Sequence, residues 1–285
     1  MTVSDISVPN VTLNDDRTIP QLGFGVFQVP PEQTQQTVET ALEVGYRHID
    51  TAQMYGNEAG VGAAIAAAGI PRDDLWITTK LNNGFHRPDD ARRTFAESLD
   101  RLGLDQVDLF LIHWPLPTRY DGDFVSTWET LVELREDGRA RSIGVSNFEP
   151  AHLDRIVEAT GVVPAVNQIE VHPFFANEAA RAAGARHGTV TEAWAPIAKG
   201  KVNDDTTIGE IADRLDRTPA QVALRWHLQR GDIVFPKSMR RERMAENFAI
   251  FDFELGDDDL ATISGLDRGE EGRTGPNPNT MDWLG

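Results

Sequence analysis

Short apolar runs alternate with longer amphipathic segments along almost the whole chain. The runs have the length of buried strands and are rich in β-branched and aromatic residues. We predict eight strands, at residues 22–25, 46–50, 75–80, 107–113, 142–146, 165–170, 190–194 and 233–237. Between them, apolar residues recur at helical spacing, as Val38, Ala41 and Leu42 do in the first such segment. The pattern predicts helices at residues 34–44, 58–68, 89–102, 124–135, 150–160, 178–187 and 219–229.

This order of strands and helices predicts an α/β fold, a (β/α)8 TIM barrel that spans residues 1–285 as a single domain. The main alternative is an open, doubly wound sheet, which usually carries G-x-G-x-x-G after its first strand. Here Gly23-Phe24-Gly25 is followed by Val26-Phe27-Gln28, so that fingerprint is absent and the barrel is favoured.

Two segments lie outside the repeating pattern. Residues 11–13 and 19–21 flank the polar stretch 14–17, which predicts a β-hairpin within about residues 10–21. We expect this hairpin to cap the bottom of the barrel. Residues 269–285 are rich in Gly, Pro and Asn and have no periodic pattern, so we expect a C-terminal loop that lies over the barrel.

Composition narrows the class of protein. The chain has 285 residues, 40% of them hydrophobic, and no cysteine, which excludes disulfides, thiolate nucleophiles and cysteine-based metal sites. No signal peptide is visible at the N-terminus, and no apolar run reaches the ~18 residues of a membrane helix. The net charge of −18 argues against nucleic acids and anionic membranes as partners. We therefore expect a cytoplasmic monomer that acts on a small molecule.

Four polar side chains should meet at the mouth of the barrel, the end where the strands finish. Asp50, Lys80 and His113 end three predicted strands, and Tyr55 follows Asp50 on a loop. A lone lysine or histidine at a strand end is usually a solvated or structural residue, but four converging groups favour chemistry. Asp50 can hold Lys80 charged, and a neighbouring ammonium lowers the pKa of a phenol. Tyr55 then becomes a usable general acid towards a carbonyl oxygen that His113 orients.

This chemistry needs a hydride but neither a nucleophile nor a metal. No side chain can supply hydride, so a nicotinamide cofactor is implied. At the ends of later strands, Ser146, Asn147 and Gln168 could hydrogen-bond a carboxamide, and Trp194 could stack on a flat ring.

One basic run stands out against the acidic background. The sequence Lys237-Ser238-Met239-Arg240-Arg241-Glu242-Arg243 follows the last predicted strand and opens a short helix. Such a helix start is typical of a phosphate site, and the number of cations suggests the extra phosphate of NADP rather than NAD. The alternative is an exposed, charged helix start without a ligand.

Several long motifs resemble the aldo-keto reductase family. The resemblance is carried by residues 45–52 with Tyr55-Gly56-Asn57-Glu58, by 109–115 and 144–148, by 166–173, and by 235–238 with Arg243, Glu246 and Asn247. It implies a catalytic tetrad of Asp50, Tyr55, Lys80 and His113, with Tyr55 as proton donor. It also implies NADPH as cofactor, bound by Gly25, Val26, Ser146, Asn147, Gln168, Trp194, Lys237, Ser238, Met239, Arg240, Arg243 and Asn247.

Within the family, the chain is most similar to bacterial 2,5-diketo-D-gluconic acid reductases, on residues 25–27, 113–115, 223–229 and 236–243. Residues 81–85 and 195–200 depart from that group. We expect Phe27, Trp114, Asn82 and Trp283 to line the substrate pocket. The alternative for Phe27 and Trp114 is packing at the rim of the barrel.

The function that these residues predict is NADPH-dependent reduction of an aldehyde or ketone, including keto-sugar acids such as 2,5-diketo-D-gluconate. One alternative is a cofactor-binding redox sensor or scaffold with the same barrel and little turnover. Another is a barrel isomerase or aldolase that uses Lys80 as a Schiff base. The intact set of four polar groups favours the reductase.

Overall fold

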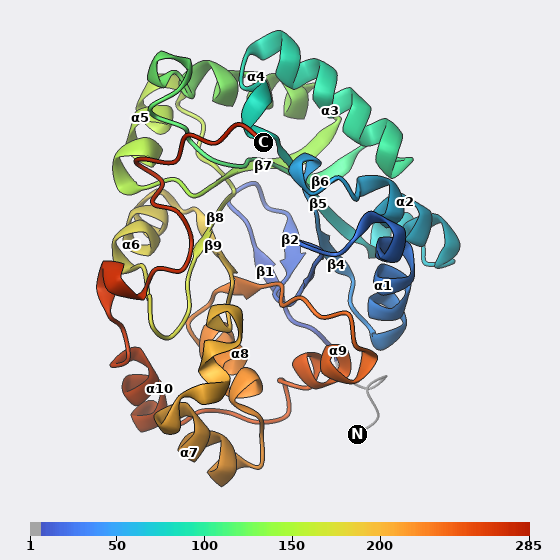
Figure 1. Cartoon of the computed structure of the whole chain (residues 1–285). Coiled ribbons are helices and arrows are strands. Elements are labelled where there is room, and N and C mark those ends of the chain that lie inside the picture. Colours follow the sequence, from blue (N-terminus) through green and yellow to red (C-terminus); the bar gives the residue numbers. More distant parts are fainter. Residues whose placement is uncertain (1–6) are drawn as a thin grey trace.

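The computed structural model describes residues 7–285 and contains the predicted barrel (Figure 1). Eight parallel strands are paired in chain order. They are β3 (Phe24–Gly25), β4 (His48–Asp50), β5 (Trp76–Leu81), β6 (Val107–Ile112), β7 (Ala140–Ser146), β8 (Val166–Glu170), β9 (Val190–Trp194) and β10 (Ile233–Val234). A parallel bridge between Leu22 and Val234 brings the last strand back to the first. The backbone N–H of Gly23 donates to the carbonyl of Val234 at 2.7 Å, which closes the sheet.

Helices surround the sheet. They are α1 (Pro31–Val44), α2 (Glu58–Ala67), α3 (Pro88–Leu102), α4 (Val125–Glu136), α5 (Pro150–Thr160), α6 (Glu178–His187), α7 (Thr206–Leu215), α8 (Pro219–Gln229), α9 (Arg241–Phe248) and α10 (Asp257–Ser264). Short 3₁₀ turns are η2 (Gln53–Tyr55), η3 (Arg72–Asp74), η4 (Asn83–Phe85), η5 (Tyr120–Gly122), η6 (Ala198–Asp204) and η7 (Gly269–Gly272). All the predicted helices are present, and α1 begins earlier than predicted because proline is accepted in a first helical turn. The predicted set did not include α7 and α10.

The predicted hairpin forms and closes the bottom of the barrel. Its strands, β1 (Asn10–Thr12) and β2 (Thr18–Pro20), pair in antiparallel fashion. Leu13 and Ile19 are buried in one cluster with residues from the amino ends of the barrel strands: Trp76, Val166 and Ile233. Burial of these apolar side chains stabilises the hairpin on the barrel.

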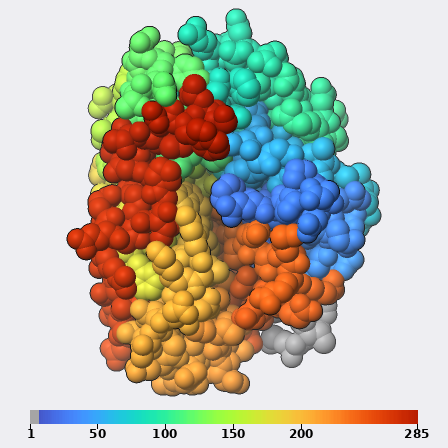
Figure 2. All heavy atoms as spheres, in the orientation of Figure 1, coloured from blue at the N-terminus to red at the C-terminus, as the bar shows by residue number. Residues whose placement is uncertain are grey.

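The C-terminal tail, residues 269–285, runs across the other end of the barrel (Figure 1). After η7, the backbone N–H groups of Thr274 and Gly275 donate to the buried carboxylate of Glu170, at 2.6 and 3.0 Å. Further on, the amide of Asn83 donates to the carbonyl of Trp283 at 2.9 Å. Figure 2 shows the tail beside a hollow in this face of the molecule. The tail is therefore one wall of the mouth.

None of the helices within residues 7–285 has the length and apolar composition that crossing a bilayer requires.

Candidate active site

Asp50, Lys80 and Tyr55 form one connected group at the mouth. Asp50 ends β4, Lys80 lies near the end of β5, and Tyr55 lies on η2. The Lys80 ammonium donates to Oδ1 of Asp50 at 2.6 Å and to the carbonyl of Thr51 at 3.0 Å. It also donates to the phenol oxygen of Tyr55 at 3.4 Å. Lys80 is fully buried, so its charge depends on these partners.

The surroundings keep both Lys80 and Tyr55 protonated. Burial alone favours the neutral amine of Lys80, but the charges of Asp50 and Tyr55 outweigh it and raise the Lys80 pKa. Burial also raises the pKa of Tyr55, and Lys80 opposes this only in part. The expectation that Lys80 lowers the pKa of Tyr55 is thus correct for the effect of Lys80 alone. It is wrong for the resulting pKa, because burial of the phenol raises the pKa by more than Lys80 lowers it.

His113 follows β6 and faces the same phenol. Its ring lies 5.7 Å from the Tyr55 ring, centre to centre, in an edge-to-face arrangement. Burial, together with the charge of Lys80, holds its pKa well below the ordinary value, so the imidazole is neutral near pH 7. A neutral imidazole carries one N–H that it can donate. The structure therefore brings all four predicted tetrad residues together.

The four residues predicted to hold a nicotinamide form a second network beside the first. The Trp194 indole N–H donates to Oδ1 of Asn147 at 2.8 Å. The amide of Asn147 donates to the His113 carbonyl and to the Ser146 hydroxyl. Ser146 in turn donates to the backbone of Gln168 at 2.8 Å. These bonds fix the tryptophan ring and three polar groups around one side of the mouth.

Gln168 also connects this network to the barrel interior. Its Nε2 donates to Oδ2 of Asp50 at 2.8 Å and to Oε2 of Glu192 at 2.9 Å. Glu192, which is fully buried on β9, was not among the predicted site residues. A signal was present: a glutamate in a predicted buried strand, two residues before Trp194, must share the inward face of that tryptophan.

The cations of the predicted phosphate site fall into two groups, one with acidic partners and one without. Arg241 pairs with Glu43 of α1, and Arg243 pairs with Glu246 within α9. Lys237 and Arg240 are exposed, and neither has an acidic partner within 4.0 Å among residues 7–285. The Ser238 hydroxyl accepts the N–H of Arg240 at 3.1 Å, next to the start of α9. The other predicted members of this site are Met239, which is exposed, and Asn247, which is buried.

Gly25 and Val26 lie at the end of β3, as expected, but the Val26 side chain is fully buried in the core. Its backbone is what reaches the site, because its N–H donates to the Asp50 carbonyl at 3.1 Å. Any ligand contact here would involve backbone atoms or Gly25.

The predicted substrate residues line the mouth and the tail. Phe27 is 55% exposed, and its ring lies 5.0 Å from that of Tyr55. Trp114 is buried against Leu116 and Met281 of the tail. Asn82 accepts the N–H of Gly84, and Trp283 is 57% exposed. His86 follows η4 and Tyr120 begins η5, and their rings stack at 5.1 Å.

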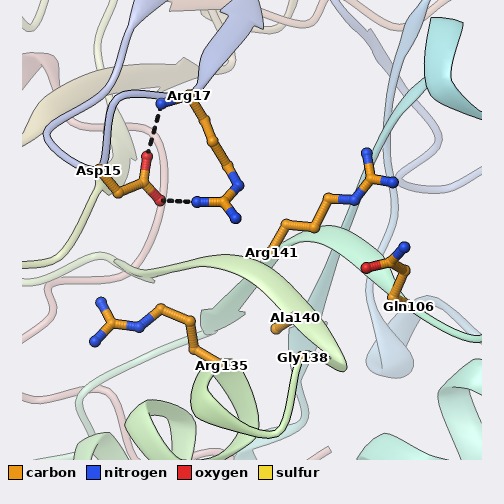
Figure 3. A pocket seen from close by; sticks show the side chains of 7 residues that line it. All are labelled: Asp15, Arg17, Gln106, Arg135, Gly138, Ala140 and Arg141. Carbon is orange, nitrogen blue, oxygen red and sulfur yellow. Dashed lines mark hydrogen bonds and ion pairs between the residues drawn. The ribbon is translucent and has the colours of Figure 1, made fainter.

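A hollow of about 360 Å³ lies at the opposite end of the barrel (Figure 3). Its lining is Asp15, Arg17, Gln106, Arg135, Gly138, Ala140 and Arg141. Arg17 pairs with Asp15, Arg141 pairs with Asp73 and Asp108, and the side chains of Arg135 and Arg141 point in different directions. These groups do not converge, so the mouth is the better candidate for chemistry.

Comparisons with known proteins show which family the chain resembles. A model of the aldo/keto reductase family matches residues 21–268. An aldo-keto reductase of Mycolicibacterium smegmatis is 49% identical over 277 residues, covering 97% of this chain and 99% of that protein.

Solved structures give the same result. A Gox0644 mutant in complex with NADPH superposes with a TM-score of 0.93 at 46% identity, covering 98% of this chain and 100% of that one. An aldo/keto reductase from Brucella melitensis gives a TM-score of 0.89 at 46% identity, covering 92% and 99%.

Proposed function

The chain belongs to the aldo/keto reductase family, and from that premise we propose that it reduces the carbonyl of an aldehyde or ketone to an alcohol with NADPH. The single observation that carries the proposal is the buried chain of Asp50, Lys80 and the Tyr55 phenol, with 2.6 and 3.4 Å between successive polar atoms. It ends in a protonated phenol at the mouth, where a substrate oxygen can reach it.

Each side chain has a distinct task in this proposal. Tyr55 donates its proton to the carbonyl oxygen as negative charge develops there. Lys80, held in place by Asp50, stabilises the phenolate that remains. Neutral His113 donates a hydrogen bond to the same oxygen and orients the carbonyl. Bound NADPH supplies the hydride.

The chemistry of the donor set fits that cofactor. Trp194 offers a flat ring whose orientation Asn147 fixes, and Gln168 keeps an oxygen without a partner among residues 7–285. Among residues 7–285, neither Lys237 nor Arg240 has an acidic partner within 4.0 Å. Both cations are therefore available to a 2′-phosphate. We propose that Ser146, Asn147 and Gln168 hold the nicotinamide amide, and that residues 237–243 with Asn247 hold the adenosine phosphate.

As a specific class of substrate we propose keto-sugar acids such as 2,5-diketo-D-gluconate. Arg119 is a cation at the tail wall, and Asp282 pairs with it at 3.3 Å. An acidic substrate would have to compete with that carboxylate, whereas the rings of Phe27 and Trp114 suit apolar groups. A panel of neutral aldehydes and keto acids therefore separates the substrate classes. We also propose a cytoplasmic location, in keeping with the absence of cysteine from the sequence, and a monomeric state.

The alternative functions have less support. A Schiff-base lysine must be reachable and neutral, whereas Lys80 is fully buried and its pKa is raised. A sensor or scaffold would not need a proton donor beside His113.

The test is the variant Tyr55→Phe, which removes only the phenol oxygen. Wild-type protein should oxidise NADPH when given an aldehyde from the panel, and Tyr55→Phe should lose at least about 10²-fold in kcat. The NADPH dissociation constant, measured by tryptophan fluorescence quenching, should stay within about twofold. Turnover by Tyr55→Phe at the wild-type rate would refute the role of Tyr55, and a wild type without turnover would favour the sensor.

A further inference from the structure

Glu192 is a buried carboxylate one layer below the proposed active site. It lies on β9, on the same inward face as Trp194, and is fully buried. Its Oε2 accepts one N–H of the Gln168 amide, and Asp50 accepts the other. Both N–H groups of Gln168 are thereby used, so the plane of its amide is fixed and its Oε1 is left to accept a hydrogen bond.

The other oxygen of Glu192 faces a neutral histidine. No hydrogen bond to Oε1 forms within residues 7–285, and Nε2 of His48 lies 3.9 Å from it. His48 has Nδ1 3.4 Å from the Pro20 carbonyl and Nε2 3.3 Å from the Thr78 hydroxyl. The nearer partner of Nε2 is therefore the Thr78 hydroxyl, and within residues 7–285 no donor reaches Oε1 to stabilise a negative charge. A buried oxygen without a donor suits a neutral carboxylic acid better than a carboxylate.

The charge balance leads to the same assignment. The titratable groups around Glu192 are His48 and Asp50 on β4 and Lys80 on β5, while β8 contributes the neutral Gln168. Lys80 already neutralises Asp50 at 2.6 Å. A second carboxylate in the same dry interior would have no cation of its own, which is costly.

We propose that Glu192 is a positioning residue for the reductase reaction: it anchors Gln168 between itself and Asp50, and it does so as a neutral carboxylic acid. This inference rests on the proposed function, because the oxygen that it directs outward is the one assigned to the nicotinamide amide. Glu192 acts through Gln168 and touches no reacting atom.

The proposal has a consequence for pH dependence. Burial and the neighbouring Asp50 raise the pKa of Glu192 to about 8. Ionisation above that pH adds a negative charge near the Asp50–Lys80 pair, which disfavours the Tyr55 phenolate and makes the phenol a weaker acid. Turnover should therefore fall as the pH rises through about 8.

Two variants of Glu192 and one matched control test these statements. Glu192→Gln keeps an acceptor for Gln168 and cannot ionise, whereas Glu192→Leu removes the acceptor. Asp108→Asn is the control, because Asp108 is an equally buried barrel carboxylate that pairs with Arg72 and Arg141 instead of the tetrad.

The first readout needs neither cofactor nor substrate. Infrared spectra of the cofactor-free wild type, recorded across the pKa of about 8, should show a carboxylic-acid C=O band that disappears with a midpoint near that value. The band should persist in Asp108→Asn and be absent from Glu192→Gln. Its absence from the wild type, or its presence in Glu192→Gln, would overturn the assignment of the proton.

The second readout is binding and turnover. Glu192→Leu should weaken NADPH binding about tenfold, as the loss of a buried hydrogen bond and of the fixed amide implies. Glu192→Gln should bind NADPH within about twofold of the wild type, and its kcat/KM should lose the decline near pH 8. Tight binding by Glu192→Leu would overturn the positioning role. If no carbonyl is turned over but Glu192→Leu still loses NADPH affinity, the proposed function fails while the positioning of Gln168 stands.

Discussion

Replacing Lys80 by methionine should separate the structural and chemical roles of the buried ion pair. Methionine has a similar length but no charge, so it leaves Asp50 buried without its cation. Lys80 is fully buried, and the Asp50 side chain is only 3% exposed. Removing one partner of a buried pair typically costs about 3–5 kcal/mol in the free energy of unfolding. We expect Lys80→Met to lose an amount in this range.

The double variant Asp50→Asn/Lys80→Met should recover at least half of that loss. The side-chain oxygen of the introduced asparagine can still accept the Gln168 amide, and no unpaired charge remains in the interior. The turnover of an aldehyde should nevertheless stay about 10²–10⁴-fold below wild type in both variants, because neither has an ammonium beside Tyr55. Stability should thus return without activity.

Urea denaturation followed by tryptophan fluorescence measures the stability, and the initial rate of NADPH oxidation measures the activity. A matched control is Arg92→Met, which breaks an ion pair of the same 2.6 Å length between Arg92 and Glu133 on the surface. It should change stability by less than about 1 kcal/mol. The reasoning is refuted if Lys80→Met is as mild as this control, or if the double variant is no more stable than the single one.

Two further predictions concern the tail and acid conditions. Glu170→Gln replaces one of the two acceptor oxygens that hold the backbone of Thr274 and Gly275 by an amide N–H₂, which cannot accept. Proteolysis of the tail should therefore be faster, and KM for the carbonyl should rise about fivefold with kcat unchanged. Equal proteolysis rates in the variant and the wild type would contradict this. Burial lowers the pKa of His48 to about 3 and of His86 to about 4, so both are neutral in the folded state. Because these folded pKa values lie below the unfolded value of ~6.5, the two histidines contribute fully to stability above about pH 6.5, and this contribution is lost as the pH falls towards about 3–4. The midpoint of urea unfolding should therefore fall between about pH 7 and pH 4.5, and an unchanged midpoint would contradict this.

The strand pattern could be predicted from the sequence because six of the eight barrel strands, namely β3, β4, β5, β6, β8 and β10, are buried on both faces along their whole length. The sequence signals of the two helices that were not predicted, α7 and α10, are weaker than those of the strands. Asp205 caps α7 by accepting the N–H of Ile208, and three aspartates occupy the first turn of α10, where the helix dipole favours acids. Both helices are short and polar on their outer faces, so the surrounding sequence resembles loops.

The convergence of Asp50, Tyr55, Lys80 and His113 could be predicted because residues at strand ends meet in any parallel barrel. Glu192 could not be selected in the same way. It lies in the middle of β9, and Asp50 is on β4, which is not a neighbour of β9 in the sheet. Only closure of the barrel brings the two carboxylates to the same amide. The net pKa of Tyr55 was missed for a related reason, since burial of the phenol depends on packing from several elements.

The inward faces of the strands explain why residues at strand ends could be selected from the sequence and Glu192 could not. Inward residues recur with a period of two, and they change from apolar at the amino ends to polar at the carboxyl ends. The series are Trp76, Thr78 and Lys80 on β5; Leu109, Leu111 and His113 on β6 and just after it; Val166, Gln168 and Glu170 on β8; and Val190, Glu192 and Trp194 on β9. The apolar layer is sealed by the hairpin, and the last layer meets the ligand. Where the middle residue is polar, it finds a hydrogen-bond partner inside the barrel: the Thr78 hydroxyl lies 3.3 Å from Nε2 of His48, and Glu192 accepts the Gln168 amide at 2.9 Å. In β9 this middle position carries Glu192, so the carboxylate that supports Gln168 lies one layer below Trp194.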